Sequence, residues 1–166
     1  MPDNDYAAAV EAAEKLKKLD DDTLIEELGL RVEAEKQPGG KELVSNFDGD
    51  FDDFSDFSPE AGPGFFRDVG RATLIRLEDD LMKFICSKDD ADRNKLLSGK
   101  SIPELAATLA LTGLVALVAA PPAWAIVVTT IVARRITLAT VDSLCGEYAK
   151  RKSARTQSSP APPTNP

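Results

Sequence analysis

The stretch that decides the fold is LAATLALTGLVALVAAPPAWAIVVTTIVA, residues 105–133, in which no side chain carries a charge. The adjacent prolines Pro121 and Pro122 interrupt it. Because proline removes a backbone donor and clashes with the preceding turn, we expect one helix to end near Ala120 and a second to begin at the prolines. The sequence therefore predicts an apolar helical hairpin at 102–148.

The segments around this hairpin also have helical patterns. Ser101 and Glu104 have the spacing of a capping box, with Pro103 in the first turn, so the hairpin is expected to start there. Upstream, apolar residues recur at steps of three and four, and each helix presents one apolar stripe. These amphipathic helices are predicted at 4–19, 23–35 and 64–86. Thr23 and Glu26 predict a further capping box at the start of the second of them.

No alternating strand pattern stands out, so the predicted fold class is all-α. We expect a small helical bundle with an apolar C-terminal helical hairpin and a disordered Ser/Pro-rich tail. The expected organisation is an acidic helical N-terminal region at 1–45, an acidic Phe-rich connector at 46–63, a helical core at 64–150 and the tail at 151–166.

The hairpin has two alternative placements. It could enter a bilayer, since the uncharged stretch exceeds the roughly 20 residues that cross about 30 Å of hydrocarbon, with Trp and cations at the interfaces. It could instead be the core of a soluble bundle, because each arm is short for a crossing and the Pro-Pro turn lacks any polar side chain. The apolar residues that matter in both cases are Leu109, Leu111, Leu114, Val115, Leu117, Val118, Trp124, Ile126, Val127 and Ile131. The flanking cations are Arg134, Arg135, Lys150 and Arg151.

A third arrangement joins these two. Amphipathic helices could sheathe the hairpin in a soluble state and release it into a membrane when they peel away. Pore-forming toxin domains and apoptosis regulators share that general design, and the likeness is one of fold-level design, without a matching motif.

The connector at 46–63 is unusually rich in phenylalanine for a linker. Four of its phenylalanines step by four and three residues and so share one helical face: Phe47, Phe51, Phe54 and Phe57. They either pack over the hairpin as a lid or dock into a groove on a protein partner. The aspartates between them begin like a calcium loop, but Asp53 stands where glycine is needed and Pro59 where a bidentate Glu is needed, so no metal site is predicted.

The composition argues against catalysis. Histidine is absent, which removes the usual general base and the commonest metal ligand. Phosphate-loop motifs are absent too, so we expect no enzyme, no catalytic residue and no cofactor. Cys86 and Cys145 are far apart in sequence, and we expect them to be reduced thiols that behave as small buried hydrophobes.

The charge of −8 is distributed unevenly. Residues 1–60 carry 18 acidic and 6 basic residues, a net charge of −12, whereas 61–166 carry +4. The acidic half repels phosphate backbones, so no nucleic-acid partner is expected. The acidic start does not resemble a signal peptide, and a cytoplasmic protein at the inner face of a membrane is expected.

Together these observations favour a non-enzymatic protein that associates with membrane lipid through its hairpin, as a membrane-perturbing effector restrained by its acidic N-terminal region or by a partner. The alternative is a soluble all-α adaptor or regulatory subunit of a protein complex, with the hairpin as core or as the interface of a homo-oligomer.

Overall fold

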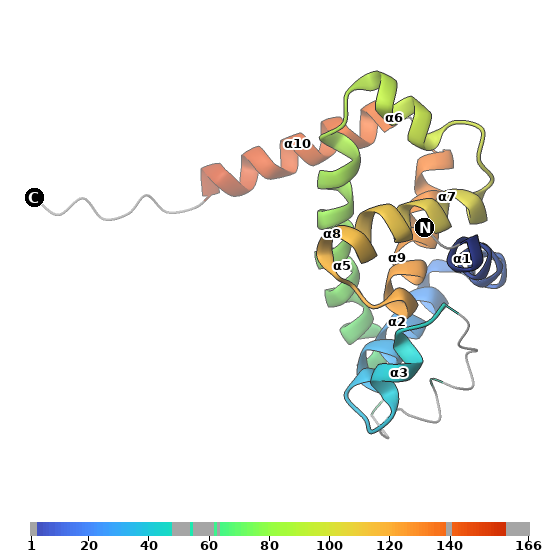
Figure 1. Cartoon of the computed structure of the whole chain (residues 1–166). Coiled ribbons are helices and arrows are strands. Elements are labelled where there is room, and N and C mark those ends of the chain that lie inside the picture. Colours follow the sequence, from blue (N-terminus) through green and yellow to red (C-terminus); the bar gives the residue numbers. More distant parts are fainter. Residues whose placement is uncertain (1–2, 48–53, 55–61, 63, 139–140, 159–166) are drawn as a thin grey trace, which may run out of the picture.

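The computed structural model describes residues 3–47, 54, 62, 64–138 and 141–158. Every regular element in these ranges is a helix, which confirms the predicted all-α bundle (Figure 1). In chain order the elements are α1 (Asp3–Leu16), α2 (Asp21–Glu35), α3 (Gly40–Val44), α5 (Phe65–Cys86), α6 (Asp90–Leu97), α7 (Ile102–Leu109), the π-helix η1 (Ala110–Val115), α8 (Ala116–Val118), α9 (Pro122–Leu138) and α10 (Val141–Ser158).

The apolar hairpin is the centre of the bundle. Its first arm is the continuous run of α7, η1 and α8, and its second arm is α9. The first arm starts at the predicted capping box: the Ser101 hydroxyl accepts the Glu104 backbone N–H at 3.3 Å, and the Glu104 carboxylate accepts the Ser101 backbone N–H at 3.2 Å. Two of the four otherwise unpaired donors of this helix start are thereby satisfied.

The π-helical turn of the first arm lies against α5. At Gly113 an added Cβ would lie 3.1 Å from Leu81 Cδ1 and 3.2 Å from Phe84 Cδ1. Glycine therefore lets the widened turn approach the α5 side chains closely. Insertions of this kind are rare in helices and are frequent at functional sites.

Amphipathic helices surround the hairpin as predicted. Helix α1 packs on α7 and α9, while α2 packs on α5 and α9. On α1 the buried residues Ala9, Ala13 and Leu16 follow helical spacing and join the same apolar cluster as the hairpin. One continuous core thus connects the sheath helices to both hairpin arms.

Helices α2 and α5 cross at backbone contact. A Cβ on Gly29 would lie 1.8 Å from the Phe66 carbonyl oxygen, and one on Gly70 would lie 1.8 Å from the Ile25 carbonyl oxygen. No other residue type fits at either position without separating the helices.

Several details differ from the sequence predictions. The N-cap of α2 is Asp20, whose carboxylate accepts the Thr23 backbone N–H at 2.7 Å, so the predicted Thr23–Glu26 capping box is wrong. The short helix α3 was not predicted, and it follows Gly39, a glycine at positive φ. The second hairpin helix was predicted to continue to residue 148, but α9 ends at Leu138 and α10 runs in a different direction (Figure 1).

Helix α10 extends away from the bundle (Figure 1). It continues to Ser158, so part of the predicted tail at 151–166 is helical, and residues 159–166 lie outside the described residues. A run of four basic residues with no acid, between Tyr148 and Ser158, belongs to this projecting part. Cations near a helix C-terminus interact favourably with the helix dipole, which supports helix formation there.

Candidate functional site

The predicted hairpin residues are buried or half-buried except at the tip of the hairpin. Fully or nearly fully buried are Leu109, Leu111, Leu114, Ile126, Val127 and Ile131. Val115 and Trp124 are half-buried. In contrast, Leu117 is 64% exposed and Val118 is 39% exposed. The structure therefore uses the hairpin as the core of the bundle and presents only its tip to solvent.

The tip is formed by α8 and the turn that follows. Ala119 adopts the left-handed conformation, with φ of 55°, and the Ala120 N–H donates to the Leu114 carbonyl at 3.1 Å. This turn ends the first arm before the prolines, where residue 120 must leave the helical region. The result is an uncharged turn with two large aliphatic side chains in water.

A hollow of about 280 Å³ lies beside the tip. Its wall combines Trp124 and the turn residues with Arg76, Leu77 and Asp80 of α5. The indole Nε1 of Trp124 is buried and has no hydrogen-bond partner among the described residues. A buried indole N–H normally has an acceptor, so Trp124 brings a polar donor to the neighbourhood of the hollow.

A buried ion pair fastens the base of the hairpin turn to α2. Arg31 is 3% exposed; its Nε donates to Glu27 Oε1 at 2.9 Å and its Nη1 donates to the Ala123 carbonyl at 2.8 Å. Its guanidinium also lies 4.5 Å from the ring centroid of Phe54. We call Arg31, Glu27 and Ala123 the clamp. Sequence reasoning missed it, although the i, i+4 spacing of Glu27 and Arg31 was visible as a signal.

The two charged side chains of the clamp, Glu27 and Arg31, are both buried. Burial raises the pKa of the Glu27 carboxyl, and the attraction of Arg31 opposes that rise. Burial likewise lowers the pKa of the Arg31 guanidinium, against the attraction of Glu27. Such a pair contributes little net stability but is costly to break on one side, because the remaining charge is left buried alone.

The four predicted flanking cations fall into two groups. Arg134 lies 3.6 Å from the Asp21 carboxylate of α2, and Arg135 donates to Glu78 of α5 at 2.7 Å. These two arginines connect α9 to α2 and α5. Lys150 and Arg151, in contrast, are exposed on α10.

Two of the predicted lid residues can be located. Phe47 and Phe54 are buried, and Phe54 packs in a small cluster with Ala34, Val44 and Ala123. Phe54 thus covers the start of the second hairpin helix, next to the clamp. Phe51 and Phe57 lie outside the described residues.

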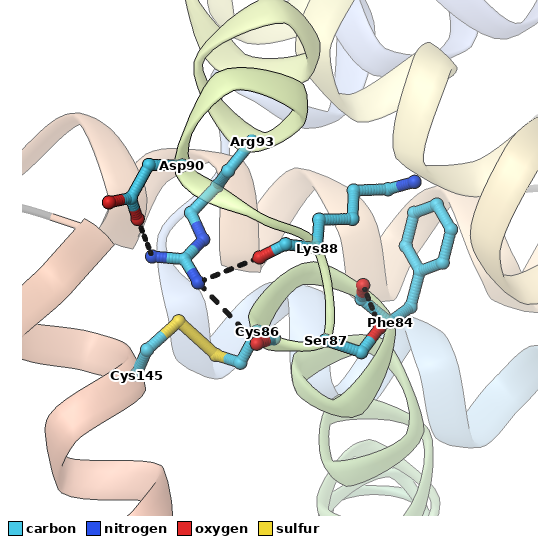
Figure 2. Close-up of a disulfide and its surroundings, with 7 residues drawn as sticks. All are labelled: Phe84, Cys86, Ser87, Lys88, Asp90, Arg93 and Cys145. Carbon is cyan, nitrogen blue, oxygen red and sulfur yellow. Dashed lines mark hydrogen bonds and ion pairs between the residues drawn. A yellow bond between two sulfur atoms is a disulfide. The ribbon is translucent and has the colours of Figure 1, made fainter.

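The two cysteines are not separate buried thiols, as was expected; they form a disulfide. Cys86 at the end of α5 and Cys145 in α10 have their Cα atoms 5.5 Å apart and their sulfurs bonded (Figure 2). The expectation failed because it relied on sequence distance, whereas the return of the chain through the hairpin brings α10 back to α5. Disulfides persist in oxidising compartments, so this pairing bears against the expected cytoplasmic location, which stays a prediction.

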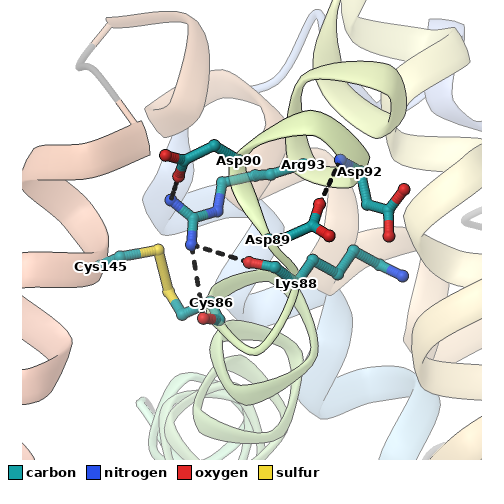
Figure 3. Close-up of polar contacts among 7 residues, drawn as sticks. All are labelled: Cys86, Lys88, Asp89, Asp90, Asp92, Arg93 and Cys145. Atoms are coloured by element: carbon teal, nitrogen blue, oxygen red, sulfur yellow. Dashed lines mark hydrogen bonds and ion pairs between the residues drawn. A yellow bond between two sulfur atoms is a disulfide. The ribbon is translucent and has the colours of Figure 1, made fainter.

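Polar contacts shape the corner around the disulfide. Arg93 of α6 donates from Nη2 to the carbonyls of Lys88 at 3.1 Å and Cys86 at 3.4 Å (Figure 2). Asp89 caps α6 by accepting the Asp92 N–H at 2.8 Å (Figure 3). The corner joins the end of α5, the start of α6 and α10, and so sets the direction in which α10 leaves.

Within the described ranges, no three His, Cys, Asp or Glu side chains are grouped so that they could hold a metal ion. A search of the same residues found no helix with the length and apolar character to cross a membrane. Comparisons with protein families, with curated proteins and with solved structures gave no match. The site must therefore be interpreted from its own chemistry.

Proposed function

We propose that this is a non-enzymatic helical protein that associates with a membrane surface through the tip of its apolar hairpin. The observation that carries the proposal is the exposure of Leu117 and Val118 at the end of a hairpin that is otherwise buried. An exposed pair of large aliphatic side chains on an uncharged turn suits the acyl–headgroup boundary of a bilayer.

The size of the tip sets the strength of such binding. Burying one Leu or Val side chain completely is worth about 1.5–3 kcal/mol, and these two are partly covered already. Tip insertion alone would therefore give weak and reversible binding, as single lipid anchors do. In this proposal the bundle stays closed at the surface, and the tip enters the outer few ångströms.

Deeper insertion of the hairpin would require the surrounding helices α1, α2 and α5 to separate from it. The clamp on Ala123 and the ion pairs Arg134–Asp21 and Arg135–Glu78 oppose it, because each joins α9 to α2 or α5. We propose that the clamp and the Arg134–Asp21 pair are the restraint by which the acidic N-terminal region holds a membrane-perturbing effector in its closed form, and that the Arg135–Glu78 pair adds a contact to α5.

Vesicle flotation tests the proposal. Wild-type protein is expected to float with phosphatidylcholine vesicles, and Leu117→Asp/Val118→Asp is expected to stay in the dense fraction. Phe65→Asp is the control, because Phe65 is 39% exposed, as Val118 is, but lies at the start of α5. If the tip variant floats as well as the control, the proposed role of the tip is wrong.

A soluble adaptor is the second candidate, and the hollow beside the tip favours it. A volume of about 280 Å³ next to the buried Trp124 donor is suited to an apolar partner side chain that also carries an acceptor. Co-purification of a stoichiometric protein partner, with its release by Trp124→Phe and no retained lipid, would support this function over membrane association.

A further inference from the structure

We infer that the projecting part of α10 is a cationic arm that binds the anionic headgroups of a membrane surface. By the arm we mean residues 148–158. The inference rests on the proposed membrane association and adds the class of lipid that is recognised.

The charge of the arm is the first observation. Glu147 is the last acidic residue of the chain, and Lys150, Arg151, Lys152 and Arg155 follow it. The side chains of Lys150 and Arg151 are exposed. In a protein of net charge −8, this is a local region of opposite sign, and it is complementary to an anionic surface.

Two of the four cations that were predicted to flank the hairpin have contacts different from those of the arm. Arg134 and Arg135 are paired with Asp21 of α2 and Glu78 of α5, whereas Lys150 and Arg151 lie further along the chain on α10. The carboxylates that face the start of the arm are Glu147 on α10 itself and Glu78 and Asp79 on α5, which line the same hollow as Arg151. The C-terminal part of α10 extends clear of the bundle (Figure 1).

The disulfide fixes where the arm begins. Cys145 is bonded to Cys86 at the end of α5, and within the next two turns Tyr148 and Arg151 line a hollow with Ile75 and Met82 of α5. From Cys145 to Ser158 the helix rises about 20 Å at 1.5 Å per residue. The covalent bond therefore gives the arm a defined direction and reach.

The arm and the hairpin tip flank the same helix. The tip turn lies beside Arg76 and Asp80 of α5, and the arm begins beside Ile75 of α5. In Figure 1, α8 and the projecting part of α10 both extend on the α5 side of the bundle, away from α1. An apolar tip combined with a cluster of cations matches the two-signal logic of reversible membrane anchoring. Nucleic acid would use the cations but would leave the aliphatic tip without a role.

The test compares vesicles of phosphatidylcholine alone with vesicles that also contain one-third phosphatidylserine. Each cation near an anionic surface is worth about a factor of five, so Lys150→Gln/Arg151→Gln should weaken binding to the anionic vesicles about 30-fold. Binding to neutral vesicles should stay the same. Because salt screens exposed charges, wild-type binding to the anionic vesicles should also weaken at high ionic strength.

The matched control is Lys17→Gln/Lys18→Gln, which removes two exposed cations at the end of α1 and changes the net charge equally. It should bind anionic vesicles within about threefold of wild type. Circular dichroism of each variant verifies that the helices are intact.

Several outcomes would overturn the inference. Equal loss of binding in the arm and control variants would show that net charge, and not the arm, is recognised. Unchanged anionic binding in the arm variant would refute the arm while leaving the tip proposal standing, provided that Leu117→Asp/Val118→Asp still abolishes binding to neutral vesicles. Binding to duplex DNA in preference to anionic vesicles, or no binding to either kind of vesicle, would also refute it.

Discussion

The crossing of α2 and α5 leads to a quantitative prediction. A Cβ at Gly29 would lie 1.8 Å from the Phe66 carbonyl oxygen, whereas real carbon–oxygen contacts of this kind are not shorter than 3.0 Å. The obstacle is backbone and cannot rotate away. Gly29→Ala therefore forces the helix axes apart by about 1 Å, since close-packed interiors have no spare volume to absorb the methyl group.

The expected cost combines two opposed effects. Overpacking a well-packed interface costs about 1–3 kcal/mol, and a gap of about 1 Å forfeits a quarter to a half of the dispersion energy of the neighbouring contacts. Ile25 and Phe66, whose backbone carbonyls lie at the crossing, mark the region that loses part of its packing. Alanine recovers up to about 1 kcal/mol of helix propensity. We therefore expect a net loss of about 2–3 kcal/mol in the free energy of unfolding.

Urea unfolding followed by circular dichroism measures this loss. Gly146→Ala in α10 is the matched control, because an added Cβ there meets nothing within 4 Å. Only the propensity effect remains for it, so its stability should rise by up to about 1 kcal/mol. If Gly29→Ala unfolds at the same urea concentration as wild type or higher, with an unchanged slope, the close backbone contact is not present in the protein.

Three further predictions concern the clamp, the hairpin start and the disulfide. Arg31→Met should lower the free energy of unfolding by about 3–5 kcal/mol, because it leaves the Glu27 charge buried alone. The double variant Glu27→Leu/Arg31→Met should recover most of this loss in thermal unfolding. Equal melting temperatures of the single and double variants would contradict this. Ser101→Ala should cost about 1 kcal/mol. The hydrogen bond from the Ser101 hydroxyl holds the pKa of the Glu104 carboxyl below its ordinary value of 4.5. The ionised carboxylate therefore stabilises the folded state above that pH, and this contribution is lost as the pH falls through the lowered pKa. Glu104→Gln should flatten the acid limb of a stability–pH curve. Finally, Cys145→Ser removes the disulfide that closes a loop of 59 residues, and the greater chain entropy of the unfolded state should lower the free energy of unfolding by about 4 kcal/mol. Reduced wild-type protein should show the same loss. Identical denaturation of oxidised and reduced protein would rule the disulfide out.

Much of the bundle could be predicted from local pattern. The hairpin could be predicted because its signals are local in sequence. They are the uncharged stretch, the two prolines and the Ser101–Glu104 capping box. The boundary between α9 and α10 had no comparable local signal. The apolar positions Val141, Cys145 and Tyr148 continue the spacing of the preceding helix, so periodicity could not reveal the change of direction.

The candidate site was less predictable because it depends on tertiary contacts. The exposure of Leu117 and the burial of Leu114, three residues earlier, depend on which helices pack against the first arm, and the sequence alone does not contain that information. No role for Arg31 was predicted from the sequence. It is buried because the Ala123 carbonyl and the Phe54 ring meet it from distant parts of the chain. The pairing of Cys86 with Cys145 likewise required the path of the whole hairpin.

The disulfide has a topological consequence for any large rearrangement. It closes a covalent ring that runs from the end of α5 through α6 and both hairpin arms to α10, while α1 and α2 lie outside the ring. As long as the sulfurs remain bonded, both ends of the hairpin segment stay attached to the end of α5, so the two must move together. The two N-terminal helices carry no such constraint and can detach separately. Oxidation state thus determines which pieces of the molecule are free to separate from one another.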